Sequence, residues 1–277
     1  MSSHSGLRVG AVSYLNAKPL YHRLEEFAPG IELTMDYPSR LADRLAAGDL
    51  DVALIPSVEY LRGSVQGYEI IPGFAIAARG PVRSVKLFCR TSPDRIHRLA
   101  LDEGSRTSQA LTRVMLAERY GVRPADVEPL PMGVPVQEST ADAVLLIGDR
   151  AMLVPDDGFH SVIDLAEAWN AWTGLPFVFA LWATRAGVDL GDFAEHLTSS
   201  RESGLRHARA IAEEHGPRLG LSVEHCVDYL TNVLSYDLGV SELAGLHRFA
   251  DSAAALSLVP EGARLVFHRR RDLATRR

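Results

Sequence analysis

The stretch Asp51-Val52-Ala53-Leu54-Ile55-Pro56-Ser57 is an apolar run that ends in a small polar residue, where a helix is expected to begin. The same transition from a buried-looking strand to a helix occurs at 9–16, 99–108 and 143–149. In an open parallel α/β sheet, ligands bind at the carboxyl ends of the strands. Helix N-termini at that edge present unpaired N–H groups and the positive end of the helix dipole. These four junctions therefore predict a crevice that binds a small anion such as a carboxylate.

The length and composition of the chain indicate two small domains of an ordinary globular protein. The 277 residues are 47% hydrophobic and 23% charged, and the length exceeds what one compact core usually needs. The net charge of −6 argues against a general nucleic-acid binder. The one basic cluster, His268-Arg269-Arg270-Arg271 with Arg276 and Arg277, is expected to be a solvated tail.

Cysteine spacing and the N-terminal segment bear on the compartment. Cys89 and Cys226 lie far apart, without a Cys-x-x-Cys motif or a histidine pair at ligand spacing, so we expect buried free thiols and no metal site. Residues 1–6 lack the charged and apolar regions of a secretory signal. No stretch approaches the roughly 20 apolar residues of a membrane span. We therefore expect a cytoplasmic protein that does not contact the membrane.

The order of predicted elements defines the fold class. Strands at 7–13, 31–37 and 51–55 alternate with helices at 19–27 and 39–48, a βαβαβ pattern that predicts a parallel sheet. Further strands are expected at 70–78, 84–90, 99–102, 127–131, 143–147 and 176–184, and helices at 107–120, 162–173, 191–215, 222–234 and 241–255.

The alternation of strands and helices begins at the N-terminus, begins again after residue 91 and gives way to helices at the C-terminus. This order indicates two α/β lobes, the second inserted into the first. We expect lobe one to comprise residues 1–88 and 184–277, and lobe two residues 89–183. The runs 85–90 and 177–184 would be the two crossovers between lobes. Each lobe is expected to hold a mainly parallel sheet flanked by helices. A ligand cleft should lie between the lobes, because pockets favour domain interfaces.

Hydroxyl groups at two of the junctions are candidate anion ligands. Ser57 is either a helix cap, worth about 1 kcal/mol, or a donor to a carboxylate in the cleft. Ser105, Thr107 and Ser108 place three hydroxyls within four residues, more than one cap requires, which favours an anion-binding nest. Arg106 in the same loop either contacts the ligand or is solvated.

Three further residues have both a structural and a functional interpretation. Asn16 either satisfies backbone groups in its strand-to-helix turn or offers its amide to a ligand. Asp149, directly after Gly148, is a helix cap, a general acid or base, or the partner of Arg150. Phe179 belongs to an aromatic stretch that is expected to pack in the core, with one ring lining the cleft as the alternative.

Several classes of enzyme lack their motifs in this chain. The histidines are scattered and none falls at a strand-to-helix junction, so a histidine base is not supported. No Gly-x-Ser-x-Gly elbow, P-loop or Gly-x-Gly-x-x-Gly is present, which argues against serine hydrolases, NTPases and dinucleotide enzymes.

Six motifs, taken in order, resemble those of a known family, the chorismate dehydratases of the futalosine route to menaquinone. They are Ser13-Tyr14-Leu15-Asn16-Ala17-Lys18-Pro19-Leu20, Ile55-Pro56-Ser57-Val58-Glu59-Tyr60, Asp102-Glu103-Gly104-Ser105-Arg106-Thr107-Ser108, Leu146-Ile147-Gly148-Asp149-Arg150-Ala151, Thr173 to Ala180 with Trp182, and Leu234-Ser235-Tyr236-Asp237-Leu238-Gly239. The resemblance covers about residues 7–250. It implies a fold like that of the type II periplasmic binding proteins.

The resemblance also implies a reaction without cofactor or metal, in which chorismate loses water to give 3-[(1-carboxyvinyl)oxy]benzoate. As catalytic residues it suggests Asn16, at the reacting edge, and Asp149, lining the cleft. As substrate-binding residues it suggests Tyr14, Ser57, Ser105, Arg106, Thr107, Ser108, Gly148 and Phe179. The base stays open, because no histidine is placed for it; a carboxylate of the substrate could serve.

Three alternatives are weighed against this interpretation. The sister enzyme of the same pathway, 1,4-dihydroxy-6-naphthoate synthase, resembles the early strands, but its histidine base in lobe two is not found here. A solute-binding protein would need a signal peptide, and a LysR-type effector domain would need an N-terminal helix-turn-helix. Apolar surface on the C-terminal helices could support a homodimer.

Overall fold

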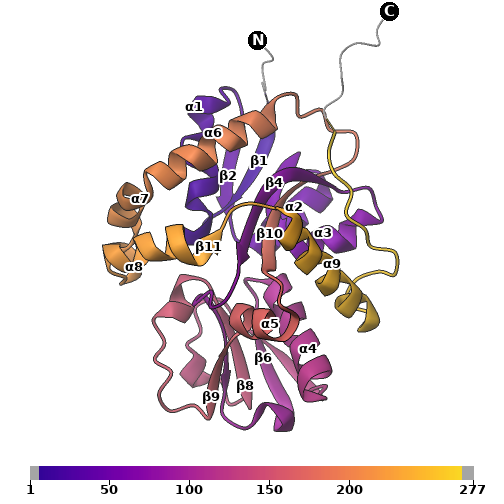
Figure 1. Cartoon of the computed structure of the whole chain (residues 1–277), viewed down its shortest axis with the longest axis vertical. Coiled ribbons are helices and arrows are strands. Elements are labelled where there is room, and N and C mark those ends of the chain that lie inside the picture. Colours follow the sequence, from indigo (N-terminus) through magenta and orange to yellow (C-terminus); the bar gives the residue numbers. More distant parts are fainter. Residues whose placement is uncertain (1–5, 270–277) are drawn as a thin grey trace, which may run out of the picture.

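Two β-sheets, one in each of two lobes, form the framework of the computed structural model, which describes residues 6–269 (Figure 1). The larger sheet contains β1 (Arg8–Val12), β2 (Glu32–Asp36), β3 (Val52–Pro56), β4 (Glu69–Ala78), β10 (Phe177–Thr184) and β11 (Leu234–Ser235), in the order β11-β4-β10-β3-β1-β2. The smaller sheet contains β5 (Val85–Cys89), β6 (Arg98–Asp102), β7 (Asp126–Leu130), β8 (Ala143–Ile147) and β9 (Ser161–Asp164), in the order β7-β6-β8-β5-β9. The predicted two-lobed α/β fold is confirmed.

Both sheets are mixed, whereas the sequence analysis expected mainly parallel ones. Strand β1 runs parallel to β2 and β3, and β6 runs parallel to β7 and β8, as the βα rhythm predicts. Strand β10 is antiparallel to β3 and β4, and β5 is antiparallel to β8 and β9. The difference arises because β5 and β10 enter their sheets from the other lobe, not through a helix that crosses back over the same sheet.

The chain passes between the lobes twice, from β4 to β5 and from the helix before residue 174 to β10. Strand pairing groups β5 with the smaller sheet and β10 with the larger sheet. The lobe limits of 1–88 with 184–277, and 89–183, stay a proposal. A division that follows the sheets would move each crossover toward the start of these strands.

The central strands β3 and β10 are almost entirely apolar because they are covered on both faces. All residues of β3 and of β10 are buried. Helices α2 (Pro38–Ala47), α3 (Ser57–Ser64) and α9 (Val240–Ala255) contact β3 or β10. Helices α4 (Arg106–Tyr120) and α5 (Leu165–Thr173) pack on the smaller sheet, and α4 also contacts α3 and α9 of the larger lobe.

The remaining helices are shorter than the sequence pattern suggested. The helix expected over 19–27 is a 3-10 helix, η1 (Leu15–Tyr21), followed by α1 (Leu24–Phe27), because Arg23 takes a left-handed conformation with φ 57°. The helix expected from Val162 starts only at Leu165, where Asp164 accepts hydrogen bonds from the N–H groups of Ala166 and Glu167. The C-terminal part contains α6 (Phe193–Arg206), α7 (Ala208–His215), α8 (Val223–Asp228) and a π-helical turn, η6 (Tyr229–Val233). Short 3-10 turns are η2 (Pro93–Arg95), η3 (Val136–Glu138), η4 (Asp149–Met152) and η5 (Pro217–Leu219).

Some sequence expectations concern features at the chain ends or outside the lobes. Cys89 and Cys226 are buried free thiols, as predicted. Within residues 6–269, no helix combines the length and apolarity needed to cross a membrane, and no group of His, Cys, Asp or Glu is arranged as metal ligands. His268 pairs with Glu69, its Nδ1 lying 2.8 Å from Oε2. Met1 to Ser5 and the basic residues Arg270, Arg271, Arg276 and Arg277 lie outside the described residues.

Candidate active site

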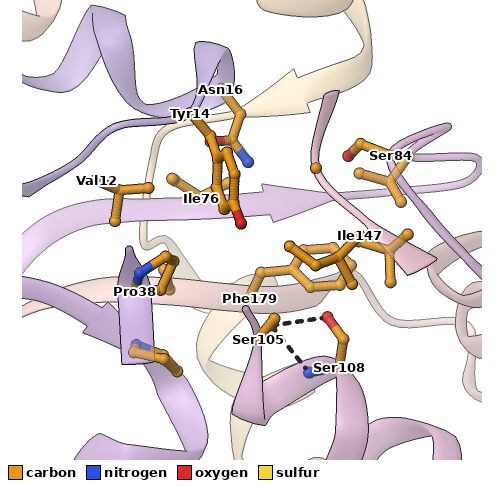
Figure 2. A pocket seen from close by; sticks show the side chains of 15 residues that line it. Val12, Tyr14, Asn16, Pro38, Ile76, Ser84, Ser105, Ser108, Ile147 and Phe179 are labelled. Atoms are coloured by element: carbon orange, nitrogen blue, oxygen red, sulfur yellow. Dashed lines mark hydrogen bonds between the residues drawn. The ribbon is translucent and has the colours of Figure 1, made fainter. Parts of the chain in front are cut away.

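A cavity lies between the lobes, where β1, β3 and β8 end (Figure 2). Its position agrees with the rule that α/β sheets bind ligands at the carboxyl ends of their strands. It is lined by Val12, Tyr14, Asn16, Pro38, Pro56, Ile76, Val82, Ser84, Val85, Ser105, Ser108, Ile147, Gly148, Phe179 and Ala180. None of these fifteen residues is charged, so a ligand here would meet hydroxyl, amide and backbone groups in an apolar setting.

Two of the predicted hydroxyls line the cavity from the N-terminus of α4. Ser105 caps the helix: its Oγ accepts a hydrogen bond from the N–H of Ser108 at 3.2 Å, and the two side-chain oxygens lie 3.0 Å apart (Figure 2). The arrangement places two hydroxyls and a helix N-terminus at one wall. This combination suits an anion, because the positive end of the helix dipole and the hydroxyl donors act together.

The third hydroxyl of that group, Thr107, points away from the cavity and toward the larger lobe. Its Oγ1 accepts a hydrogen bond from the N–H of Val58 at 3.1 Å and lies 3.4 Å from the Oγ of Ser57. Ser57 is fully buried and donates to the carbonyl oxygen of Val178 at 2.7 Å. Ser57 therefore neither lines the cavity nor caps α3, whose N-cap position is held by Pro56. Of the two alternatives for Ser57, the capping role is wrong, because the serine is already the first helical residue.

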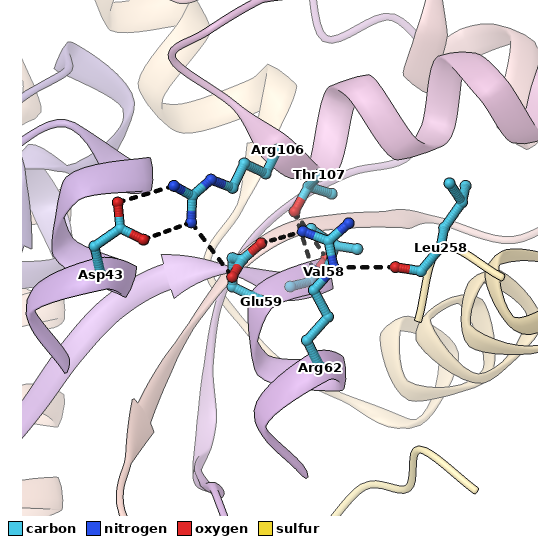
Figure 3. Close-up of polar contacts among 8 residues, drawn as sticks. Asp43, Val58, Glu59, Arg62, Arg106, Thr107 and Leu258 are labelled. Carbon is cyan, nitrogen blue, oxygen red and sulfur yellow. Dashed lines mark hydrogen bonds and ion pairs between the residues drawn. The ribbon is translucent and has the colours of Figure 1, made fainter. Parts of the chain in front are cut away.

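Arg106 also turns away from the cavity and joins the two lobes (Figure 3). Its guanidinium donates to both carboxylate oxygens of Asp43 on α2, at 2.8 and 2.9 Å, and lies 3.5 Å from Oε2 of Glu59 on α3. Glu59 in turn pairs with Arg62, whose Nε donates to the carbonyl of Leu258 at 3.0 Å. Arg106 is thus partly exposed, held by carboxylates of the larger lobe, and absent from the residues that line the cavity.

Asp149 lies behind the cavity wall and bridges the lobes. It is 9% exposed, its Oδ2 accepts a hydrogen bond from the N–H of Leu15 at 3.4 Å, and its Oδ1 has no hydrogen-bond partner. Burial raises the pKa of this carboxyl to about 6. Arg150 pairs with Asp102 instead, at 2.5 Å, so of the three alternatives for Asp149 the pairing with Arg150 is wrong.

Tyr14 and two glycines form a close contact between the lobes at the cavity. A Cβ atom at Gly148, where φ is +73°, would lie 3.2 Å from Cε1 of Tyr14, and one at Gly104 would lie 2.7 Å from the Tyr14 hydroxyl oxygen. Only glycine leaves room for the ring there. Burial raises the pKa of Tyr14, so its hydroxyl stays protonated and can donate a hydrogen bond.

Phe179 satisfies both interpretations of the aromatic stretch. Its ring meets Phe177 edge to face, with centroids 4.8 Å apart, and Phe177 packs against Trp169 and Phe249 in the core. Phe179 itself lines the cavity and offers a flat apolar wall to a ring-shaped ligand.

Asn16 and Ser84 supply the polar groups on the opposite wall. The Oδ1 of Asn16 is buried without a hydrogen-bond partner, so it is available to a ligand. Ser84 was not singled out in the sequence, because it stands at no strand-to-helix junction. It lies in the crossover from β4 to β5, and the only signal that could have found it is its place between the two lobes.

Comparisons with known proteins agree on the family. A family model described as menaquinone biosynthesis matches residues 7–255. The chain is 33% identical to a chorismate dehydratase of Thermus thermophilus, over 88% of this chain and 94% of that protein. It is 26% identical to a chorismate dehydratase of Campylobacter jejuni, over 90% and 98% of the two chains. A 1,4-dihydroxy-6-naphtoate synthase of Streptomyces coelicolor is also 26% identical, over 84% and 86%.

Solved structures share the fold. An alkanesulfonate-binding protein of Xanthomonas axonopodis matches with a TM-score of 0.68 and 19% identity, over 94% of this chain and 96% of that one. The periplasmic aliphatic sulphonate binding protein of Escherichia coli gives 0.64 and 16%, over 99% and 97%. These matches confirm the periplasmic-binding-protein-like fold that the sequence motifs implied. With its family model matched over 7–255 and a relative at 33% identity, the chain belongs to the menaquinone-biosynthesis family.

Proposed function

We propose that this protein is a chorismate dehydratase, which converts chorismate to 3-[(1-carboxyvinyl)oxy]benzoate and water. The observation that carries the proposal is the 33% identity, over 94% of the relative, to a chorismate dehydratase. The cavity between the lobes supports it, since a helix N-terminus with two serines faces a wall of uncharged groups. Chorismate is a cyclic dicarboxylate; Phe179 suits its ring, and the serines at the start of α4 suit one of its carboxylates.

The reaction requires little of the protein beyond orienting the substrate. Removal of the proton on C3 and of the hydroxyl on C4 forms an aromatic ring, so the products are strongly favoured. The enzyme must hold the diacid, exclude water and manage one proton. No ionisable carboxylate, histidine or lysine lines the cavity within the described residues, which supports a carboxylate of the substrate as the base.

Each wall of the cavity is assigned a part in the proposed reaction. Ser105 and Ser108, with the N-terminus of α4, bind one carboxylate. Asn16 contacts the C4 hydroxyl through its unpartnered oxygen. Phe179 and Tyr14 cover the ring. Asp149 fixes the turn that carries Asn16 through the N–H of Leu15, and Arg106, Thr107 and Ser57 act through contacts between the lobes.

The direct test is incubation of the purified protein with chorismate, followed by chromatography with mass detection. We expect an aromatic product that has lost one water, without added metal or nucleotide. Unchanged chorismate, from protein shown to be folded, would reject the proposal. Turnover of the cyclic futalosine-derived substrate instead would assign the activity of the sister enzyme, to which the chain is 26% identical.

We also infer that the enzyme acts in the cytoplasm on a free small molecule, with no nucleic acid or membrane as partner. The biosynthetic relatives support this location. A homodimer formed through the C-terminal helices stays a prediction, which light scattering of the purified protein can check.

A further inference from the structure

A buried tyrosine outside the cavity hydrogen-bonds to one of its polar side chains. Tyr229 begins the π-helical turn η6 and is fully buried. Its hydroxyl donates to the Oγ of Ser84 at 2.7 Å. Ser84 and Asn16 both line the cavity, whereas Tyr229 does not. Turns of π-helix interrupt α-helices frequently at functional sites, and this one directs the phenol at the cavity wall from behind.

The direction of this hydrogen bond determines what Ser84 can offer a ligand. A tyrosine hydroxyl has one proton to donate and lone pairs with which to accept. Because the Oγ of Ser84 accepts the hydrogen bond from Tyr229, Ser84 keeps its own hydroxyl proton to donate to a ligand.

Hydrogen bonds hold the backbone around Ser84 in place and so help to position its hydroxyl. The carbonyl oxygen of Ser84 accepts a hydrogen bond from the N–H of Gly148 at 2.8 Å. The preceding residue, Arg83, has φ 65°, a left-handed conformation that non-glycine residues seldom adopt. The carboxylate of Asp164 holds it there by accepting from the N–H groups of Val82 and Arg83, at 3.1 and 2.6 Å.

We propose that Tyr229 is a positioning residue of the active site, which orients Ser84 as a hydrogen-bond donor toward the hydroxyl group that leaves the substrate. The proposal rests on the proposed dehydratase function. A departing hydroxyl gains negative charge on its oxygen, and a hydrogen-bond donor such as Ser84 stabilises that charge.

The variant Tyr229→Phe tests the proposal, with Tyr236→Phe as the matched control. Both tyrosines are buried, but the hydroxyl of Tyr236 has no hydrogen-bond partner. We expect Tyr229→Phe to lower kcat about tenfold, the usual effect of losing one such hydrogen bond in the transition state, with a smaller change in KM. Tyr236→Phe should leave both values near those of the wild type. In a Ser84→Ala background, Tyr229→Phe should cost much less, because the partner is already gone.

Unchanged kcat in Tyr229→Phe, an equal loss in Tyr236→Phe, or full additivity with Ser84→Ala would each overturn the proposal. Crystal structures of the wild type and Tyr229→Phe give a second readout that does not need activity. We expect the side-chain oxygen of Ser84 to move in the variant. If it keeps its position, Tyr229 does not orient Ser84, whatever the substrate. If wild-type protein fails to convert chorismate while the Ser84 side chain does move, only the proposed function falls.

Discussion

At the scale of single residues, Asn16 carries the proposed chemistry most directly. Its side-chain oxygen is buried without a hydrogen-bond partner, and Asn16 lines a cavity whose described wall offers no charged group. We expect Asn16→Ala to lower kcat by about two orders of magnitude, as loss of a group that acts in the transition state does. Thermal unfolding of the variant should match the wild type, since no strand or helix depends on this side chain. Near-normal turnover would remove Asn16 from the mechanism.

Asp149 makes stability depend on pH. Its pKa is about 6 in the folded protein, well above the ordinary aspartate value, because burial disfavours the charge. The folded state therefore keeps this proton longer than the unfolded state does, and the contribution is lost as pH rises toward and through 6. Asp149→Asn, which cannot ionise, should raise the melting temperature at pH 8 and leave it nearly unchanged at pH 4. The free-energy gain at pH 8 would be at most about 3 kcal/mol.

A matched variant separates this effect from a general change in surface charge. Asp157 is exposed, so Asp157→Asn should shift the melting temperature little and equally at both pH values. A gain for Asp149→Asn that is the same at pH 4 and pH 8 would contradict the assignment of the pH dependence to Asp149.

Which residues reach the cavity could be predicted only in part. The strand-to-helix junctions located Tyr14, Asn16, Ser105, Ser108 and Gly148 at its wall. Ser57, Arg106 and Thr107 belong to the same junctions but face other partners, because successive helical residues point in directions about 100° apart. A strand-to-helix junction that is recognised in the sequence indicates where a helix starts. It does not indicate how that helix is rotated about its axis, and so which of its side chains face the cavity.

At the scale of elements, α4 is the main contact of the smaller lobe with the larger one. Arg106 in its first turn pairs with Asp43 and Glu59, and Glu118 in its last turn pairs with Arg248 of α9 at 2.9 Å. We expect Arg106→Ala to raise KM a few-fold with less effect on kcat, because exposed ion pairs are worth about 1 kcal/mol or less. Steady-state kinetics at low and high salt would check this, and the difference should shrink at high salt.

The matched control for the Arg106 variant is Arg23→Ala. Arg23 also pairs with a carboxylate, that of Glu26, but both residues belong to the larger lobe. Its loss should leave KM unchanged. If both variants raise KM alike, the contact between lobes is not the cause.

The elements that sequence patterns missed are those fixed by distant partners. The start of α5 was expected three residues too early, because Asp164 caps that helix while also holding the Val82–Arg83 backbone, more than 80 positions earlier. The crossover strands β5 and β10 were identified as strands, but their antiparallel direction depends on which lobe each one joins. Neither the start of α5 nor the direction of β5 and β10 can be recognised from the sequence next to them.

At the scale of the whole molecule, the position of β10 allows a test with truncated chains. It pairs with both β3 and β4 in the middle of the larger sheet, although it lies more than 90 residues after β4. A chain that ends at residue 176 would expose the facing edges of β3 and β4, and unpaired edges promote aggregation. We expect this fragment to be recovered mainly as aggregates, whereas residues 79–176, which hold every strand of the smaller sheet, should stay monomeric in gel filtration. A monomeric 1–176 fragment would contradict this expectation.

The position of β10 also determines when each lobe can fold during synthesis. As the polypeptide leaves the ribosome, its first three strands and β4 emerge early, yet the gap between β3 and β4 closes only when residue 184 has been made. The inserted lobe has all its strands by residue 164 and can fold while the larger lobe still lacks β10. Domains generally fold as units in the order in which they emerge. Here the larger lobe is the first to be synthesised, but its sheet is completed after that of the inserted lobe.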